Sequence, residues 1–194
     1  MSVSVNTIAH PVTTRNGGRY DGFTIALHWT TAILVVTLFA LAEAWNLMPN
    51  GTPLRKLFQS WHVSLGIILA ATIVTRLVWR SLFGRHLPGE ANPITRAAGW
   101  AAHVALYALL IAQASLGVTL RWAQGESLSL FGLFSIPAAF APSKALENAS
   151  EDLHNTLAWA IMGIALIHAS AALWHHYAKH DGILRRMLPA RTEP

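Results

Sequence analysis

Cysteine is absent from all 194 residues of the sequence. Without thiolates the chain forms no disulfides, no cysteine-bound zinc sites and no cysteine-bound iron–sulfur clusters. Charged residues are also scarce, at 12% of the chain, which is about half the share found in typical soluble domains. Hydrophobic residues make up 53%, and the mean hydropathy is +0.39. This composition predicts an integral membrane protein.

The net charge of +5 has two interpretations, a nucleic-acid partner or basic loops that face anionic lipid. The basic residues are dispersed along the chain rather than gathered in one soluble segment. The sequence therefore predicts a lipid bilayer as the partner and no nucleic acid.

Four apolar stretches each approach the roughly 20 residues that a helix needs to cross a bilayer. They cover approximately residues 23–44, 57–79, 97–122 and 152–178, and leave 1–22 and 179–194 as tails. None contains a proline, and helices satisfy their own backbone polar groups in lipid. We therefore expect an all-α, integral membrane four-helix bundle over residues 23–178. The apolar connection 123–151 is too short and proline-broken for a fifth span, and predicts either a cap over the outer surface or a loose interfacial loop.

The first stretch also resembles a signal peptide, because Arg15 and Arg19 precede an apolar run that ends in Ala-Leu-Ala at 40–42. The run is longer than a typical signal core, and His28 lies inside it. Both features favour a helix that is retained.

Basic residues predict the orientation of the bundle, because they are enriched on the cytoplasmic side of membrane proteins. One side would hold Arg15, Arg19, Arg76, Arg80, Arg85, Arg96, Lys179, Arg185, Arg186 and Arg191. The other side would hold Arg55, Lys56, Arg121 and Lys144, together with Glu43, Glu126, Glu147, Glu151 and Asp152. Both termini are therefore predicted to be cytoplasmic.

Histidines interrupt all four stretches, and those in the first, second and fourth lie at matching depths. His154 and His168 are 14 residues apart, so they share one helix face and lie about 21 Å apart along the axis. Because consecutive spans run in opposite directions, His62 lies at the depth of His154, in the outer half. His28 lies at the depth of His168, in the inner half. The sequence predicts two stacked sites, each with two histidines.

Two imidazoles on one iron are a standard haem arrangement, and a helical bundle can enclose the flat macrocycle. Such an iron keeps no open position, so electron transfer is the expected chemistry. Gly66, one turn after His62, would let a porphyrin lie close to the helix. Arg76 lies on the same face at the inner level, where it would either pair with a haem propionate or extend to the lipid headgroups. Zinc is the main rival, but it usually takes three or four ligands at one level.

Three further histidines have open roles. His103, in the inner half of the third span, is either a neighbour of the inner site or an alternative ligand to His28. His175 continues the stripe of His168 and would either hydrogen-bond a quinone carbonyl or remain solvated at the interface. His176 points elsewhere on the helix and has no assigned role.

Several stretches, in this order, resemble the bacterial cytochrome b561 family. They are IALHW (25–29), WHVSLGI (61–67), AHVALY (102–107), LHNTLA (153–158), HASAALWHHY (168–177) and LRRMLP (184–189). The resemblance implies a four-helix bundle in the bacterial inner membrane that holds two haem b groups. It implies the iron ligand pairs His28 with His168 and His62 with His154, and a quinone site at His175.

The best-known activity in that family is superoxide oxidation, so the resemblance implies a superoxide:quinone oxidoreductase. Superoxide would be oxidised at the periplasmic face, and ubiquinone would be reduced near the inner haem. The alternative is a haem b subunit or electron carrier that serves a periplasmic partner such as a dehydrogenase or hydrogenase. A membrane protein that binds metal without haem is a third hypothesis.

Overall fold

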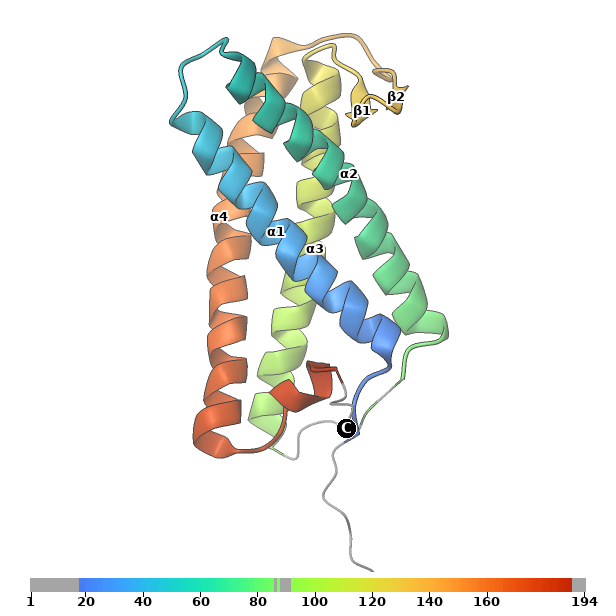
Figure 1. The fold of residues 1–194 in the computed structure, drawn as a ribbon, viewed down its shortest axis with the longest axis vertical. Helices are drawn as coiled ribbons and strands as arrows, with labels where there is room; N and C mark the ends of the chain where they lie inside the picture. The colour runs from blue at the N-terminus through green and yellow to red at the C-terminus, as the bar shows by residue number, and fades with distance from the viewer. Residues whose placement is uncertain (1–17, 86, 88–91, 190–194) are drawn as a thin grey trace, which may run out of the picture.

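The computed structural model describes residues 18–85, 87 and 92–189. Four long helices dominate this part of the chain (Figure 1), and each is long and apolar enough to cross a membrane. They are α1 (Gly22–Asn46), α2 (Pro53–Leu82), α3 (Pro93–Ala123) and α4 (Lys144–Trp174). The predicted all-α membrane four-helix bundle is therefore confirmed. Arg15 and Arg191, which contribute to the predicted orientation, lie outside the described residues.

Short polar residues determine where the helices begin. The N-cap positions accept a hydrogen bond from a backbone N–H in the first turn, as this position favours. They are occupied by Asp21, Thr52, Asn92 and Ser143. Proline follows the cap in α2 and α3, where its missing N–H costs nothing. α4 begins at Lys144, well before the predicted span, because Ser143 caps two polar turns that precede the apolar stretch.

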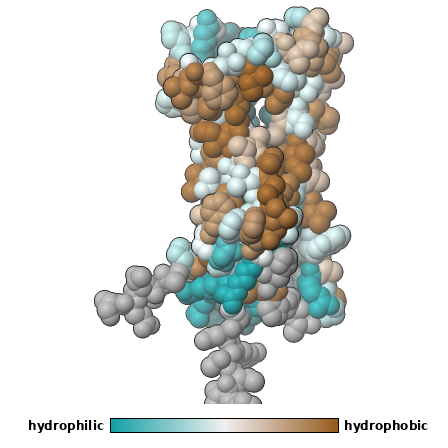
Figure 2. Space-filling view, turned by 90° about the vertical axis from the view of Figure 1, so that its right-hand side faces the viewer, coloured by the Kyte–Doolittle hydropathy of each residue, from teal (hydrophilic) through white to brown (hydrophobic). Residues whose placement is uncertain are grey.

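The tightly buried core lies at the middle of the bundle. Packing is closest between α1 and α2 and between α3 and α4. The buried cluster consists of Leu34, Leu38, Leu69, Ile73, Leu110 and Ile161. The outer surface at this level is mainly hydrophobic, with hydrophilic residues at both ends of the molecule (Figure 2). The bundle thus presents an apolar belt to its surroundings, as a bilayer requires.

Both ends of the described chain lie at one end of the bundle, which we call the terminal end. After α4 come a π turn, η1 (His175–Lys179), and a 3-10 turn, η2 (Leu184–Met187), which returns over the start of α1. The indole of Trp29 donates to the Met187 carbonyl at 2.8 Å, and the Tyr20 N–H donates to the Arg186 carbonyl at 3.1 Å. These bonds join the two ends of the chain.

Asp21 joins α1 to α2 at the same end. Its carboxylate accepts hydrogen bonds from the Thr24 N–H at 2.8 Å and from the Trp79 indole at 3.1 Å. Burial alone would raise the pKa of Asp21, but bonds from Thr24, Arg85 and Trp79 outweigh it and lower the pKa to about 2. This carboxylate is therefore ionised at neutral pH.

The connection between α3 and α4 lies at the opposite end of the bundle, which we call the hairpin end. There β1 (Leu128–Leu130) pairs antiparallel with β2 (Phe134–Ile136), and Ser129 lies opposite Ser135. β1 contacts both α2 and α3. The hairpin lies beside the upper part of α2 (Figure 1). This connection is thus a hydrogen-bonded element packed against the bundle.

Candidate functional site

Near the hairpin end, His62 of α2 and His154 of α4 face each other. Their ring centroids are 6.2 Å apart, and the ring planes make an angle of 64°. Nδ1 of His62 lies 3.1 Å from the Leu38 carbonyl oxygen. A carbonyl only accepts, so Nδ1 carries the proton and donates this bond. Nε2 of His62 is then the unprotonated atom, as in a metal-binding histidine oriented by a backbone carbonyl.

Near the terminal end, His28 of α1 and His168 of α4 form a second pair. Their ring centroids are 6.4 Å apart at an interplanar angle of 70°. His168 follows His154 by 14 residues on α4, so the two pairs are separated by about 21 Å along that helix. The structure thus brings together the two pairs expected from depth.

The spacing of both pairs fits an iron atom between two imidazoles. A metal–imidazole bond is about 2.0 Å, and the ring centroid lies about 1.1 Å beyond the nitrogen. Two imidazoles on opposite sides of one iron therefore place their centroids about 6.2 Å apart. The observed values of 6.2 Å and 6.4 Å agree with this distance. Ligation of haem iron by these four histidines is a prediction that the geometry permits.

Glycines lie beside the pair at the hairpin end. A Cβ added to Gly117 of α3 would lie 3.3 Å from Cε1 of His154, so a larger residue would press against this ring. A Cβ added to Gly66 of α2 would meet nothing within 4 Å, so the α2 backbone borders open space. Nδ1 of His154 is buried and makes no hydrogen bond of normal geometry within the described chain. These features fit a site that accepts a flat group beside α2 and α3.

An apolar layer separates the two pairs. Ile161 lies seven residues from both His154 and His168 on α4 and is 3% exposed. It packs with Leu34 of α1 and Ile73 of α2 in the buried core. Water is thereby excluded from the space between the sites, so electrons rather than hydrated ions suit this path.

His103 of α3 contacts the pair at the terminal end. Its ring centroid lies 5.2 Å from that of His168. This is about 1 Å too short for two imidazoles on opposite sides of one iron. The geometry therefore favours His28 over His103 as the partner of His168, and places His103 against the site as a neighbour.

Arg76 of α2 reaches the same pair. Its guanidinium lies 2.9 Å from Nδ1 of His28, and its Cζ lies 5.3 Å from the centre of the Tyr107 ring. Among the described residues, no carboxylate forms an ion pair with it. A cation inside a membrane bundle ordinarily has an anionic partner. Arg76 thus has a position suited to a negatively charged group bound at this level.

His175 begins the π turn and lies further toward the terminal end. Its Nδ1 is paired with the Asp181 carboxylate. Burial would raise the pKa of Asp181, but hydrogen bonds from His175 and from the Ile183 N–H, with the charge of Lys179, lower it. The same histidine ends a shallow groove of about 580 Å³ that is open to the surroundings and runs along one face of α4. The other lining residues are Leu166, Ile167, Ser170, Ala171 and Trp174. An apolar groove ending in a histidine can hold an apolar ring with a polar oxygen.

Two residues near these sites, Asp181 and Arg55, were not predicted from the sequence to take part in them. Asp181 lies in the turn after α4, and only its position six residues after His175 could have indicated the pairing. Arg55 donates to the Trp45 carbonyl at 2.6 Å and to the Met48 carbonyl at 3.0 Å. The Trp45 ring in turn packs against His62, with ring centroids 4.9 Å apart. No local pattern connects Arg55 to His62, because the contact runs through the α1–α2 turn.

The described part of the chain contains no cluster of side chains of the kind that binds zinc. No group of three or more His, Cys, Asp or Glu side chains gathers there around a common point suited to a metal ion. The four histidines proposed as ligands form two separated pairs, and His103 lies against the pair at the terminal end. The hypothesis of a metal protein without haem therefore has no supporting geometry here.

Comparisons with known proteins agree with this arrangement. Residues 19–190 match the family described as prokaryotic cytochrome b561. Cytochrome b561 homolog 2 of Escherichia coli is 34% identical over 178 residues, covering 88% of this chain and 91% of that protein. Cytochrome b561 homolog 1 of the same organism is 29% identical over 181 residues, covering 89% and 98%. The probable superoxide oxidase CybB of Yersinia pestis is 26% identical over 178 residues, covering 89% and 97%.

Proposed function

Because the chain belongs to the prokaryotic cytochrome b561 family, whose members transfer electrons in membranes with b-type haem, we propose that it oxidises superoxide and reduces ubiquinone. The single observation that carries the proposal is the pair of stacked histidine sites with iron-compatible spacing. His62 and His154 hold one haem, and His28 and His168 hold the other. Bound haem supplies an iron that gains and loses one electron at a time.

The overall reaction balances with two superoxide anions for each quinone. Two superoxide anions lose one electron each and become dioxygen. The quinone takes both electrons and two protons and becomes quinol. The two half-reactions occur at opposite ends of the bundle, and the apolar layer around Ile161 keeps water out of the path between them.

Cations near His62 support superoxide as the electron donor. The outer side has more acidic than basic side chains, which by itself would repel an anion. However, Arg121 pairs with Glu126 and Lys144 pairs with Glu147, whereas Arg55 is held by backbone carbonyls. Its guanidinium charge is therefore not cancelled by an ion pair in the described structure. Arg55 lies seven residues before His62, about 10 Å along α2, and it bonds the backbone of Trp45, whose ring packs on His62.

His175 and its groove support quinone reduction at the other end. The pairing with Asp181 leaves Nε2 of His175 as the ring nitrogen available to a quinone oxygen. A protonated ring would donate to that oxygen, and Asp181 would stabilise the imidazolium. The alternative interpretation, a solvated interfacial histidine, predicts no effect of either residue on quinone reduction.

Arg76 is proposed to hold a propionate of the haem between His28 and His168. A guanidinium only donates, so Nδ1 of His28 accepts their 2.9 Å hydrogen bond and the ring proton is on Nε2. A histidine that binds iron through Nε2 carries its proton on Nδ1 instead. Two donors cannot share one bond, so Arg76 turns to another acceptor when His28 is ligated. A propionate is the anionic acceptor of the haem itself.

The proposed location is the bacterial inner membrane with both termini in the cytoplasm. Described basic residues gather at the terminal end, which is the side that the positive-inside rule assigns to the cytoplasm. They include Arg19, Arg80, Arg85, Arg96, Lys179, Arg185 and Arg186. The hairpin end, with the superoxide-oxidising site, would then face the periplasm.

Stopped-flow mixing of the oxidised holoprotein with superoxide tests this function. We expect rapid appearance of the reduced b-type haem bands, their decay when a short-chain ubiquinone is added, and loss of the signal when superoxide dismutase is mixed first. Haem that stays oxidised in superoxide but is reduced by a chemical reductant would contradict the proposal. That result would favour a membrane subunit or carrier for a periplasmic dehydrogenase or hydrogenase.

A further inference from the structure

The hairpin between α3 and α4 is unusually apolar for an extramembrane connection. No charged residue occurs from Ser127 to Ser143. Large hydrophobic side chains around its turn are exposed, including Phe131 at 46%, Leu133 at 81% and Phe134 at 50%. Water is a poor environment for such a surface.

The backbone of the turn is satisfied within the protein. The hydroxyl of Ser64 accepts a hydrogen bond from the Phe131 N–H at 2.9 Å. The same oxygen lies 3.1 Å from the Ser129 carbonyl and 3.0 Å from the Ser60 carbonyl, either of which its single proton can reach. Ser64 is fully buried, at 0% exposure. This serine fastens the turn to α2.

The remaining N–H groups of the turn also have partners. The Gly132 N–H donates to the Ser129 hydroxyl at 3.2 Å, and the Leu133 N–H donates to the Leu130 carbonyl at 2.9 Å. Phe131 and Gly132 both have positive φ angles, 49° and 75°, which tighten the turn enough for these bonds. Hydrocarbon cannot replace the hydrogen bonds that water would supply, so a segment in lipid needs this internal satisfaction.

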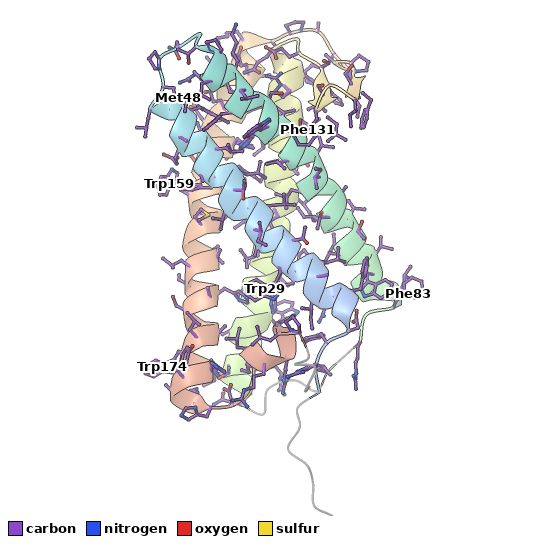
Figure 3. All side chains as sticks on the ribbon, viewed as in Figure 1. Trp29, Met48, Phe83, Phe131, Trp159 and Trp174 are labelled. Carbon is purple, nitrogen blue, oxygen red and sulfur yellow. The ribbon has the colours of Figure 1, made fainter. Side chains whose placement is uncertain are left out.

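The depth of the turn follows from α2. Ser64 lies eight residues beyond Lys56, which corresponds to about 12 Å along the helix toward the terminal end. From Leu128 to Phe131 the chain extends about 10 Å. The turn therefore lies closer to the middle of the bundle than Lys56, the charged residue of α2 that precedes Ser64. Figure 3 shows Phe131 beside α2, and Figure 2, which views this side, shows hydrophobic surface from the middle of the bundle to near the hairpin end.

We propose that the hairpin of β1 and β2 is a re-entrant element whose turn inserts into the acyl chains of the adjacent leaflet. β1 contacts both α2 and α3, and its Leu128 is only 6% exposed, so the inner face of the hairpin packs against the bundle. The outer face, with Leu133 at the turn, contacts lipid.

The absence of cysteine allows a clean labelling test. Leu133→Cys in the full-length holoprotein would be labelled with an environment-sensitive fluorophore and placed in phosphatidylcholine–phosphatidylglycerol vesicles. Asn50→Cys, in the exposed turn between α1 and α2 at the same end, is the matched control. We expect doxyl lipids to quench the label at 133 at least threefold more than the label at 50, and aqueous iodide to show the opposite order.

Equal iodide quenching at both positions would overturn the proposal, and would leave the apolar turn for a protein partner in water. Ser64→Ala tests the attachment to α2, with Ser60→Ala as the control that keeps the Ser60 carbonyl. In the Leu133→Cys background, Ser64→Ala should at least halve the doxyl quenching, and Ser60→Ala should leave it unchanged. Unchanged quenching in Ser64→Ala would overturn the role of this hydroxyl. Because these readouts need no haem reduction, they are independent of the proposed superoxide activity.

Discussion

Arg76→Gln is expected to lower the reduction potential of the haem between His28 and His168 much more than that of the other haem. A nearby cation destabilises the oxidised iron more than the reduced iron, so its removal favours the oxidised state. The guanidinium lies 2.9 Å from Nδ1 of His28. An iron bound by His28 would lie about 4 Å further through the ring, and a guanidinium that turns from Nδ1 to a propionate stays beside the same haem, so the separation is about 7 Å.

The size of the shift follows from Coulomb's law. At about 7 Å and an effective dielectric constant of about 20, one unit charge contributes about 2.4 kcal/mol, or about 100 mV for one electron. His62 is 14 residues from Arg76, so the other haem is about 21 Å away. At this distance the same calculation gives a contribution from the Arg76 charge of about 0.8 kcal/mol, or about 35 mV, before screening by salt. The ratio of the two shifts is therefore at least about three.

Spectroelectrochemical titration of the purified protein in detergent measures both potentials. Arg76→Lys keeps the charge and should retain most of the wild-type value. Arg80→Gln removes a cation whose guanidinium packs on the Tyr20 ring, 5.8 Å from its centre, and should have a smaller effect. Loss of one haem in Arg76→Gln, with the other spectrum unchanged, would agree with a propionate contact. Equal shifts in both haems, or none, would refute the placement of Arg76 beside the site at the terminal end.

Three other predictions use the same framework. Arg55→Gln should slow haem reduction by superoxide about tenfold at low salt and weaken its salt dependence, since steering of an anion needs the nearby cation; an unchanged stopped-flow rate would remove Arg55 from the donor site. Asp181→Asn should slow quinone-dependent reoxidation about 100-fold while leaving the superoxide phase intact, because His175 loses the group that stabilises its imidazolium; equal slowing of both phases would contradict this role. Asp21→Ala should cost about 1 kcal/mol of stability at neutral pH through the lost N-cap, measured by thermal unfolding in detergent. Because the pKa of Asp21 is lowered to about 2, its contribution is complete above its ordinary pKa of 3.8 and disappears as the pH falls toward 2, so wild type and variant should converge in acid.

The bundle and the depth of its histidines could be predicted from the sequence because membranes impose a fixed length and helices a fixed rise. Fourteen residues separate His154 from His168, and this spacing alone indicated two levels. The choice between His28 and His103 could not be made in that way, since both lie in the inner half of their spans. It required the ring distances to His168, 6.4 Å and 5.2 Å.

The contacts that hold the hairpin against the bundle were not predictable. Ser64 bonds to Ser129, 65 residues later, and a serine within an apolar helix has many possible partners. Phe131 adopts a positive φ without being glycine or asparagine, so the neighbouring Gly132 alone could not define the shape of the turn. The hairpin therefore remained an undefined cap or loop until its three-dimensional packing was known.

The central claim is that two haems are stacked, each between one histidine of α4 and one from another helix. Haem per chain, measured by the pyridine haemochrome assay with electron paramagnetic resonance of the oxidised protein, tests it most directly. We expect two low-spin haems in the wild type and one in each of His62→Ala and His28→Ala, with a different low-spin signal lost in each variant. A single haem in the wild type, or two low-spin haems that persist in His62→Ala, would contradict the stacked arrangement. Two low-spin haems that persist in His28→Ala alone would make His103 the inner ligand.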